Sequence, residues 1–379
     1  MKVAVYGTGN YALRLIKYLE ETKFRTNIMN QQQWSYEIVY FVESNPKKNS
    51  FLDKKVICAR DINWSDFDFL VIAIKGYEEI IAYLKDEIES YEQNIKKVVH
   101  SVEFTYNMRG PYSTYPYQCV NVNKGELKFL YNTKDRIVSE AMLATGRAYP
   151  DDLIDLFFSL TRQYYGERRG VFLDIGANIG TTSIYVKKIV NPELRVIGIE
   201  CGKENYNLFR INCILNNAED IEIEEIGFSN YNGTGKYIYN ETNSGNSCVI
   251  NESINQRNLD DVSLTTLDEY IKDKNIGSGD IGYIWMDTEG HESEIIEGAK
   301  NTLSNSRIPL MQEFNYRDYI KKGLFDSYLN NIGKIYTSFI DARYYLKSNE
   351  MIIKNIYELK DYSEWMNNSG REQTDLFFF

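Results

Sequence analysis

The sequence predicts an α/β protein with two parallel-sheet units, one after the other along the chain. Short apolar strands alternate with amphipathic helices, and a strand that runs into a glycine turn and a helix occurs twice, at 2–21 and at 169–190. Alternating strands and helices imply parallel sheets with right-handed crossovers. With 379 residues, 43% of them hydrophobic, the chain is long enough to build two cores.

The first unit is predicted over residues 1–105 as a small Rossmann-like α/β domain. Its first strand is Lys2–Tyr6, which leads into a turn at Gly7 and Gly9 and then into apolar residues at helical spacing. The remaining strands are expected at 36–43, 66–76 and 96–102, with a helix at 77–91.

Residues 106–149 are predicted to form a connector with short strands, because the stretch is rich in tyrosine and carries two prolines close together. The second α/β unit is predicted over residues 150–379, and its first strand carries Asp174 at its carboxyl end. Helices are expected at 150–167, 181–190, 203–218, 264–273 and 292–305. Strands are expected at 195–200, 221–229, 281–290, 309–315 and 374–379, with a hairpin at 230–250 and further strands in the tail after 315.

Charge and hydropathy exclude several classes of protein. The net charge of −11 argues against nucleic acid as the main partner, because phosphate contacts need a basic face. No run of 18 apolar residues occurs, so no membrane-spanning helix is expected. The first residues lack the pattern of a signal peptide, which predicts a cytoplasmic protein.

Cysteine and histidine usage argues against a metal centre built from these residues. The five cysteines are odd in number, widely spaced and without a CxxC pair, which favours reduced thiols over disulfides or a zinc site. The only histidines are His100 and His291, which excludes a histidine-rich metal site. We therefore expect no metal.

The second glycine turn has the features of a ligand site. It reads Asp174-Ile-Gly176-Ala-Asn178-Ile-Gly180, with the acid at the end of a buried strand. Glycine permits unusual backbone angles and close approach of a ligand, and open α/β sheets bind ligands beyond their carboxyl strand ends. Glu200 ends the next strand, 26 positions after Asp174, where a carboxylate can accept hydrogen bonds from two ribose hydroxyls. The pair predicts an adenosine-type ligand.

The acid that opens this turn distinguishes between ligands. A pyrophosphate favours G-x-G-x-x-G, whereas Asp174 would repel phosphate and attract the positively charged amino acid end of S-adenosylmethionine. Taken alone, the turn has a second interpretation of about equal weight: Asp174 caps the next helix and the two glycines serve a tight turn.

Together with further motifs, the turn resembles the FkbM-type S-adenosylmethionine-dependent methyltransferases. The matching segments follow the family's order: LDIGANIGTTS (173–183), IGIE (197–200), NLFRINCILNN (207–217), SLTTLDEYI (263–271), IWMDTEGHESEIIEGA (284–299) and QEFN (312–315). The resemblance covers about residues 126–379, with TDLFFF as the final strand. One departure is Cys201-Gly202, where the family often has proline after the ribose acid.

The resemblance implies a class I methyltransferase fold that binds S-adenosylmethionine through Asp174, Gly176, Asn178, Gly180, Glu200 and Asp287. It also implies methyl transfer to oxygen, and we expect a sugar hydroxyl as acceptor, in glycan or polysaccharide biosynthesis. One alternative is N-methylation of an amino sugar or a peptide amine. Another is a non-catalytic binding protein that retains the fold, against which the complete set of acids argues.

Catalytic candidates follow the strand that ends near residue 286. A sugar hydroxyl is a weak nucleophile, so a general base would help. His291 has a near-neutral intrinsic pKa and is the first candidate; Asp287 or Glu289 would orient it, or act as the base if burial raises their pKa values. Other interpretations are a solvated loop position for His291, a helix-start acid for Glu289 and a surface or capping acid for Glu292.

Three further features stay open between function and structure. Glu313 ends the next strand and is expected to hold the acceptor or a metal, although acid spacing alone does not identify a magnesium site. The polar segment 242–248 is either a loop near the cofactor or a plain hairpin turn. The asparagines near the end of the helix at 203–218 have either a binding or a helix-end role; they are Asn212, Asn216 and Asn217.

The first glycine turn, G-T-G-N-Y-A at 7–12, approximates the dinucleotide motif. The acid after it, Glu43, comes 34 positions after Gly9, which is longer than the usual gap. The domain could hold a nucleotide or nucleotide sugar, dock a protein partner, or serve as a degenerate scaffold, and we favour the last two. A dehydrogenase would need a complete substrate domain, for which the downstream pattern leaves no room.

Overall fold

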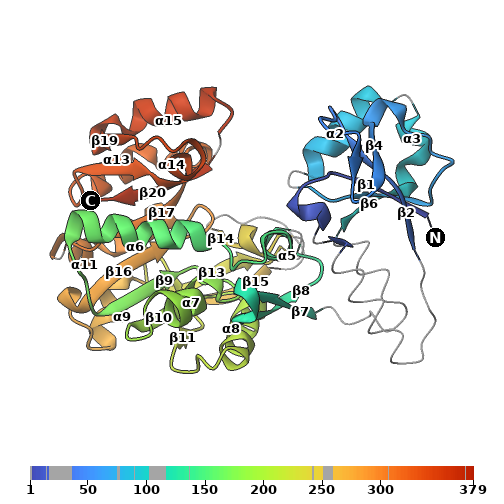
Figure 1. Ribbon diagram of the computed structural model, residues 1–379. Helices are drawn as coiled ribbons and strands as arrows, with labels where there is room; N and C mark the ends of the chain where they lie inside the picture. The colour runs from blue at the N-terminus through green and yellow to red at the C-terminus, as the bar shows by residue number, and fades with distance from the viewer. Residues whose placement is uncertain are drawn as a thin grey trace. The chain divides into compact units, whose positions relative to one another are not determined.

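The computed structural model describes residues 2–13, 15–16, 36–74, 77–88, 90–101, 117–135, 137–240, 243–250, 259–305, 307–371 and 373–379 (Figure 1). The chain divides into two compact units, Met1–Gln118 with Asn132–Arg147, and Cys119–Tyr131 with Ala148–Phe379. The connector predicted at 106–149 is thus shared between the units. Most of the tyrosine-rich part of that connector lies outside the described residues.

The first unit is built on a six-stranded sheet with the order β3-β4-β2-β1-β5-β6. Its strands are β1 (Lys2–Tyr6), β2 (Glu37–Glu43), β3 (Ser50–Phe51), β4 (Lys54–Cys58), β5 (Phe69–Ile72) and β6 (Val98–His100). Only β3 runs antiparallel to its neighbour. The described helices are α2 (Tyr77–Glu87), α3 (Tyr91–Asn94) and α5 (Val138–Thr145). The predicted strands of this unit are confirmed. β3 and β4 were not predicted, and β3, with two residues, is too short for a periodic signal.

The second unit contains an eight-stranded sheet with the order β11-β10-β9-β16-β17-β20-β18-β19. Its strands are β9 (Val171–Ile175), β10 (Arg195–Ile199), β11 (Glu222–Glu224), β16 (Ile281–Met286), β17 (Leu310–Asn315), β18 (Ser338–Asp341), β19 (Ile353–Asn355) and β20 (Gln373–Phe378). β9 and β16 are buried along their whole length, as expected for parallel strands covered on both faces. β20 runs antiparallel to both β17 and β18.

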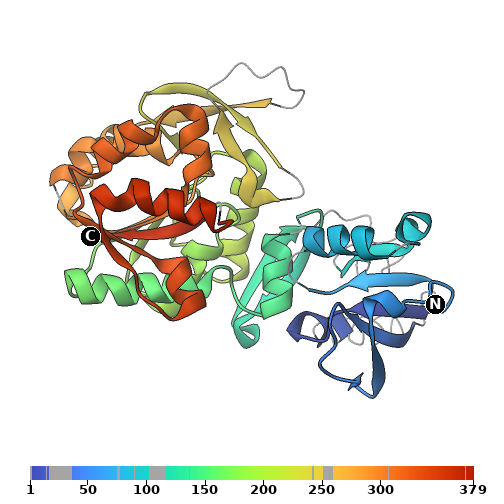
Figure 2. The ribbon, with the colours of Figure 1, turned by 90° about the horizontal axis from the view of Figure 1, so that it is seen from above.

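Helices cover this sheet. They are α6 (Asp151–Tyr165), α7 (Thr181–Tyr185), α8 (Lys203–Leu215), α9 (Leu267–Asp273), α10 (Glu292–Gly298), α11 (Lys300–Asn305), α12 (Tyr316–Lys322), α13 (Phe325–Ile332), α14 (Ala342–Ser348) and α15 (Leu359–Asn368). Phe157 of α6 packs edge-on against rings from three strands: Phe172, Tyr283, Trp285 and Phe377. Figures 1 and 2 show α6, in green, lying against the sheet. None of the described helices is long and apolar enough to cross a membrane.

A separate four-stranded sheet, β12-β15-β13-β14, belongs to the same unit. Its strands are β12 (Gly227–Phe228), β13 (Gly233–Ile238), β14 (Cys248–Ile250) and β15 (Leu259–Thr265). A small core of Tyr237, Val249, Val262 and Leu264 holds it together. A two-stranded sheet pairs β7 (Tyr117–Val122) with β8 (Leu127–Asn132).

Several predicted elements differ from the structure: the strand expected at 281–290 ends at Met286, and the helix expected at 292–305 is divided into α10 and α11. The strand expected at 221–229 is two strands, β11 and β12, which belong to different sheets. The helix expected at 264–273 begins only at Leu267, because β15 continues to Thr265 and the hydroxyl of Thr266 caps the helix by accepting the Glu269 N–H at 3.1 Å. The tail expected to hold strands also contains α12 to α15, and the buried residues of α13 and α15 recur at helical spacing.

Candidate functional site

Asp174 lies on β9 and is 1% exposed. The Ser183 hydroxyl donates a hydrogen bond to its Oδ2 at 2.6 Å, whereas its Oδ1 has no hydrogen-bond partner among the described residues. Burial raises the pKa of Asp174 to about 7. A buried carboxylate oxygen without a donor calls for an explanation, and a ligand donor is one.

The glycines of the turn allow the backbone to approach its neighbours. Gly176 has a φ of +84°, and a Cβ there would lie 1.8 Å from the carbonyl oxygen of Asp287. A Cβ on Gly180 would lie 2.0 Å from the ring of Phe209. The tight-turn interpretation of both glycines therefore holds, and the polar atoms available to a ligand are Asp174 Oδ1 and the buried Asn178 Oδ1, which also has no partner in the described chain.

Glu200 follows β10 directly and is 6% exposed. Its Oε2 accepts the Asn178 N–H at 2.9 Å, and its Oε1 accepts the Gly202 N–H at 2.7 Å. The Tyr237 hydroxyl lies beside Gly202, where it would be 2.3 Å from a Cβ on that residue. Burial, the largest influence, raises the pKa of Glu200 to about 7. The two acids predicted as a pair thus end neighbouring strands, and β9 and β10 pair in parallel.

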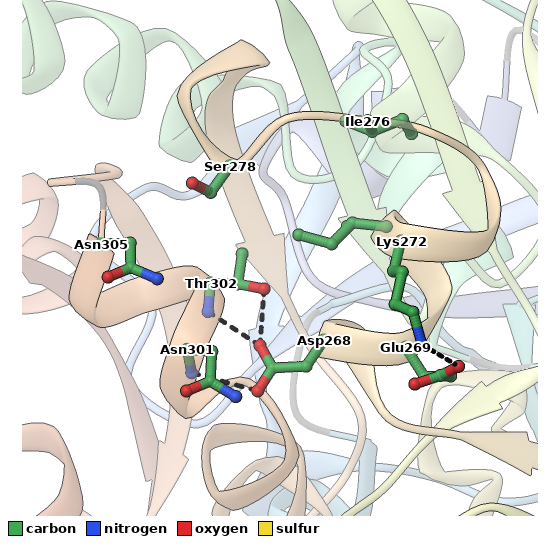
Figure 3. A pocket seen from close by; sticks show the side chains of 9 residues that line it. Asp268, Glu269, Lys272, Ile276, Ser278, Asn301, Thr302 and Asn305 are labelled. Carbon is green, nitrogen blue, oxygen red and sulfur yellow. Dashed lines mark hydrogen bonds and ion pairs between the residues drawn. The ribbon is translucent and has the colours of Figure 1, made fainter.

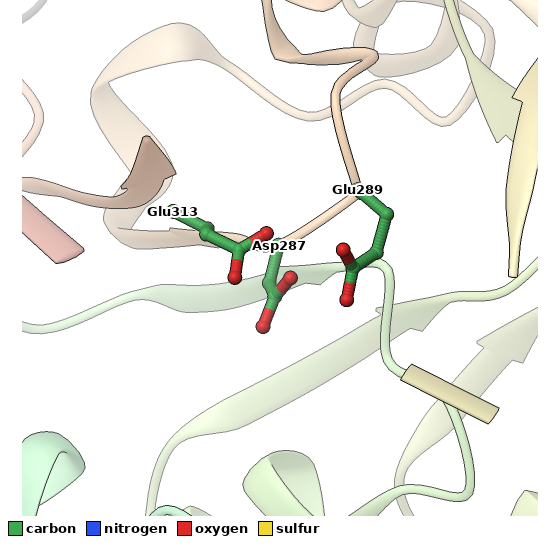
Figure 4. Close-up of side chains that lie close together, drawn as sticks. All are labelled: Asp287, Glu289 and Glu313. Carbon is green, nitrogen blue, oxygen red and sulfur yellow. The ribbon is translucent and has the colours of Figure 1, made fainter. Parts of the chain in front are cut away.

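Asp287, Glu289 and Glu313 form a carboxylate cluster (Figure 4). Each offers an oxygen within 4.8 Å of the others. Asp287 follows β16, Glu313 lies on β17, and Glu289 occupies the turn after Asp287 with a φ of +54°. Such a set of oxygens could also hold a divalent cation.

Burial and mutual repulsion keep protons in the carboxylate cluster. Burial and then the charge of Asp375 raise the pKa of Asp287 to about 7; burial and then Asp287 raise the pKa of Glu289 to about 9. The pKa of Glu313 is raised well above its ordinary value for the same reasons. Like charges this close cannot all be ionised, so the cluster holds at least one proton at neutral pH.

Three residues around the cluster were not predicted. Asp375 lies on β20 opposite Glu313 and forms an ion pair with the half-buried Arg343 of α14, which also hydrogen-bonds Tyr149. The positive charge of Arg343 acts to lower the pKa of Asp287. In the sequence, Asp375 could have been placed here only by assuming that the segments QEFN and TDLFFF form neighbouring strands.

The segment 243–248, the described part of the predicted polar loop, lies beside the cluster. A Cβ on Gly245 would lie 3.6 Å from Glu289 Oε1 and 3.1 Å from Asn243 Oδ1. Ser247 Oγ accepts the Asn240 N–H at 3.0 Å. The polar segment is thus held beside Glu289.

His291 does not join the cluster. It is 2% exposed, its Nε2 lies 3.0 Å from Ser229 Oγ, and its Nδ1 lies 3.9 Å from Glu294 Oε1. Burial, and then the charge of Lys322, lowers its pKa to about 4, so the ring is neutral at neutral pH. Among the described residues, the contacts of His291 are with Ser229 and Glu294 rather than with the carboxylate cluster. The solvated-loop interpretation is wrong, because the side chain is buried.

Two other open interpretations are resolved by contacts. Glu292 is not a surface acid: it is 1% exposed, and its Oε1 accepts the N–H groups of Thr288 and Gly290 at 2.9 and 3.3 Å. It therefore fixes the turn that carries Glu289. Asn212 of α8 and Asn216, which directly follows α8, exchange side-chain hydrogen bonds with the backbone of Leu130 and Lys128 on β8, which is a structural role.

A pocket between α9 and α11 lies apart from all predicted site residues (Figure 3). Asp268 dominates its polar lining. Its carboxylate accepts the N–H groups of Asn301 and Thr302 at 3.0 and 2.7 Å and the Thr302 hydroxyl at 2.6 Å. These bonds cap the start of α11, so we assign the carboxylate a structural role.

Comparison with known proteins decides the family. Residues 174–350 match the family described as "Methyltransferase FkbM domain". The chain contains an FkbM methyltransferase domain. Its eight-stranded sheet, with β20 antiparallel between β17 and β18, is the sheet of a class I methyltransferase.

Solved structures similar to the chain include other methyltransferases. Methyltransferase FkbM from Methylobacillus flagellatus KT is 13% identical, with 100% of this chain and 90% of that chain covered and a TM-score of 0.35. Precorrin-6y C5,15-methyltransferase from Geobacter metallireducens GS-15 is 12% identical over 59% of this chain and 87% of that chain, with a TM-score of 0.31. The bifunctional kinase-methyltransferase WbdD is 16% identical over 46% and 31%, with a TM-score of 0.28. No curated protein matches the chain significantly.

His291→Ala in the FkbM domain is expected to lower the free energy of unfolding by about 1–3 kcal/mol, because it removes the hydrogen bond between the buried ring and the buried Ser229 hydroxyl. The methyl-transfer rate of the folded variant is expected to stay close to wild type. Denaturant unfolding and a rate assay measure the two effects. A large loss of rate with unchanged stability would return His291 to the mechanism.

Proposed function

We propose that the FkbM domain is an S-adenosylmethionine-dependent O-methyltransferase that acts on a sugar hydroxyl in glycan or polysaccharide biosynthesis, in the cytoplasm. The observation that carries the cofactor assignment is the pair of buried carboxylates at the ends of β9 and β10, one of which keeps an oxygen without a donor in the described structure. Such groups suit a ligand that carries both ribose hydroxyls and a positive charge.

Each residue of the turn has its own part in holding the cofactor. Glu200 would accept hydrogen bonds from the ribose hydroxyls, and Asp174 Oδ1 would face the positively charged amino acid end. Asn178 Oδ1 offers a further acceptor; Gly176 and Gly180 let the turn close on its neighbours. When bound, the cofactor supplies an electrophilic methyl group. A sugar hydroxyl can attack that group once it is positioned and its proton is removed.

The carboxylate cluster is proposed to bind the acceptor and remove that proton. Asp287 lies against the cofactor turn through its backbone contact with Gly176, and its pKa of about 7 leaves it partly ionised at neutral pH. It therefore takes the hydroxyl proton, in place of His291. Glu289, whose pKa is about 9, stays protonated and donates a hydrogen bond to the acceptor, and Glu313 orients Asp287 and the acceptor.

N-methylation of an amino sugar or peptide amine is the second candidate. The negative charge of the cluster favours neutral or positively charged acceptors over anionic ones. An amine meets that condition, but it is a stronger nucleophile than a hydroxyl when neutral and has less need of a poised base. The two candidates therefore differ in their dependence on Asp287.

The test is methyl transfer from labelled S-adenosylmethionine by the full chain to a panel of neutral sugars, nucleotide-linked sugars and amino sugars. Mass spectrometry of the product then distinguishes O-methyl from N-methyl groups. The proposal predicts an O-methylated sugar. Transfer only to the amino sugars would favour the second candidate, and cofactor binding without transfer to any acceptor class would favour a binding protein.

Affinity for S-adenosylhomocysteine is expected to rise with pH between 6 and 8. The pKa values of Asp174 and Glu200 lie near 7, above the ordinary values of 3.8 and 4.5, so the cofactor-free fold disfavours their ionised forms. These groups therefore lower the stability of the cofactor-free fold as pH rises from about 4 to about 7. A ligand that needs the carboxylates ionised instead gains about tenfold in affinity per carboxylate between pH 6 and pH 8. Calorimetry at three pH values measures this rise, and a flat profile would contradict the assignment.

For the first unit we propose a docking or scaffold role, with a protein partner as the occupant in the docking case. The Thr8 hydroxyl hydrogen-bonds the Glu43 carboxylate, so the acid that a nucleotide would use is already engaged. A Cβ on Gly7 would lie 2.4 Å from the side chain of Ile74, so this glycine serves packing within the unit. These contacts favour the docking and scaffold interpretations over the nucleotide interpretation.

A further inference from the structure

Two aromatic side chains from α14 and α15 form a corner at the surface of the second unit. Trp365 of α15 is 44% exposed, and Tyr344 of α14 is half-buried. Their ring centroids lie 6.0 Å apart at an interplanar angle of 75°, and the ring of Tyr362 supports Trp365 at a centroid distance of 5.2 Å. We call Trp365 and Tyr344 the aromatic corner. An exposed indole held by neighbouring rings offers a ligand a flat apolar face at a low cost in side-chain entropy.

The aromatic corner lies at the same edge of the sheet as the carboxylate cluster. β17 and β18 both run antiparallel to β20, and Glu313 of β17 is opposite Asp375. Asp341, the last residue of β18, is opposite the next residue of β20. Adjacent strands lie about 4.8 Å apart, so the backbones of Glu313 and Asp341 are separated by about 10 Å across β20. Asp341 caps α14 by accepting the Tyr344 N–H at 2.8 Å, which places Tyr344 at this edge.

The charged groups in contact with the aromatic corner distinguish between ligands. The Arg371 guanidinium lies 5.1 Å from the centre of the Tyr344 ring. Its Nη2 donates to Asp341 Oδ2 at 2.6 Å, so its charge is already paired. The Tyr344 hydroxyl donates to Glu350 Oε2 at 3.4 Å. The Glu350 carboxylate would repel a phosphate group, but it can accept hydrogen bonds from hydroxyl groups. These contacts favour a neutral, hydroxyl-rich ligand over an anionic one.

We propose that the aromatic corner binds one sugar unit of a neutral oligosaccharide, while another unit of the same chain presents its hydroxyl to the carboxylate cluster. The C–H face of a sugar ring stacks on an aromatic ring, and the hydroxyls at its rim are left free to bond polar neighbours. The separation between the two sites suits a short chain of sugars rather than a single one. The inference rests on the proposed function, because it takes the methyl acceptor to be a sugar, and it narrows that acceptor to an oligosaccharide.

The test is binding of the full chain to an array of neutral oligosaccharides, as wild type, Trp365→Ala and Trp365→Phe. The wild type is expected to bind at least one oligosaccharide. Trp365→Ala should bind it about 3- to 10-fold more weakly, the range of one lost stacking contact. Trp365→Phe keeps a ring, so its affinity should lie between the two, and it serves if the alanine variant does not fold.

Tyr357→Ala is the matched control. Tyr357 is 72% exposed and follows β19. It lies near the opposite edge of the sheet, because Asn355 of β19 is opposite Ser338, the first residue of β18. Loss of this ring should leave oligosaccharide binding unchanged.

Kinetics provide a second measurement on the same variants. With the bound oligosaccharide as acceptor, Trp365→Ala should raise KM by about the factor by which it weakens binding and leave kcat close to wild type, because Trp365 does not touch the reacting hydroxyl. Methyl transfer to a single sugar should be the same in both proteins.

The outcomes separate the inference from the proposed function. Absence of binding to any neutral oligosaccharide, or equal binding by wild type and Trp365→Ala, overturns the inference alone when single sugars are still methylated. Trp365-dependent binding of a nucleoside diphosphate in place of the oligosaccharides also overturns it. Trp365-dependent binding of an oligosaccharide, without methyl transfer to any sugar, confirms the aromatic corner as a sugar site and overturns the proposed function.

Discussion

Asp287→Asn is expected to lower the rate of methyl transfer by about 10²–10⁴-fold, the contribution of a positioned general base. Asparagine keeps the size of the side chain but cannot take the proton of the acceptor hydroxyl. Single-turnover transfer from a labelled cofactor measures the chemical step. Cofactor affinity is expected to change much less, because the contact of residue 287 with the cofactor turn is made by its backbone.

A control variant and a stability measurement distinguish the loss of a base in Asp287→Asn from a loss of structure. Glu297→Gln changes an acid of α10 that bonds Asn230 and Lys300 and should leave the rate unchanged. Asp287→Asn should also make the fold more stable above pH 7, because the cluster loses one of its repelling charges. A near-normal rate for a stably folded Asp287→Asn would remove Asp287 as the base and favour an amine acceptor.

Glu200→Gln is expected to weaken the binding of S-adenosylhomocysteine by about 1.5–3 kcal/mol, or about 10- to 150-fold. The amide loses the charge that strengthens the ribose hydrogen bonds. It also sets an NH₂ group against the N–H of Asn178 or Gly202, which both donate to the native carboxylate. Calorimetric titration measures the change.

Glu224→Gln is the matched control for this substitution. Glu224 ends the adjacent strand β11 and contacts Lys274 and Tyr270 rather than the cofactor turn. Its loss should not alter the affinity. An equal loss of binding in both variants would indicate a general disturbance of the sheet edge, and unchanged binding in Glu200→Gln would remove Glu200 from the ribose site.

Much of the site could be predicted because parallel strands bring distant segments to one edge. Asp174, Glu200, Asp287 and Glu313 each end or directly follow an apolar run, so their convergence required only the order of the strands. The same reasoning placed Glu289 beside them.

The rest of the site depends on packing that no periodic pattern reports. His291 and Glu292 follow the same strand as Asp287, but α10 begins at once and carries both side chains into the interior. Arg343 reaches the cluster only because β20 inserts antiparallel between β17 and β18. Tyr237 lies on a hairpin whose sequence gave no sign that it packs over Gly202. Such contacts depend on side-chain rotamers and on the register of separate sheets.

The most direct test of the cofactor assignment is a pair of calorimetric titrations of the full chain at pH 8, one with S-adenosylhomocysteine and one with NAD. The acids at Asp174 and Glu200 predict one S-adenosylhomocysteine bound per chain, with affinity that depends on Glu200, and no binding of NAD at this turn. Tight, Glu200-dependent binding of NAD together with no binding of S-adenosylhomocysteine would contradict the assignment.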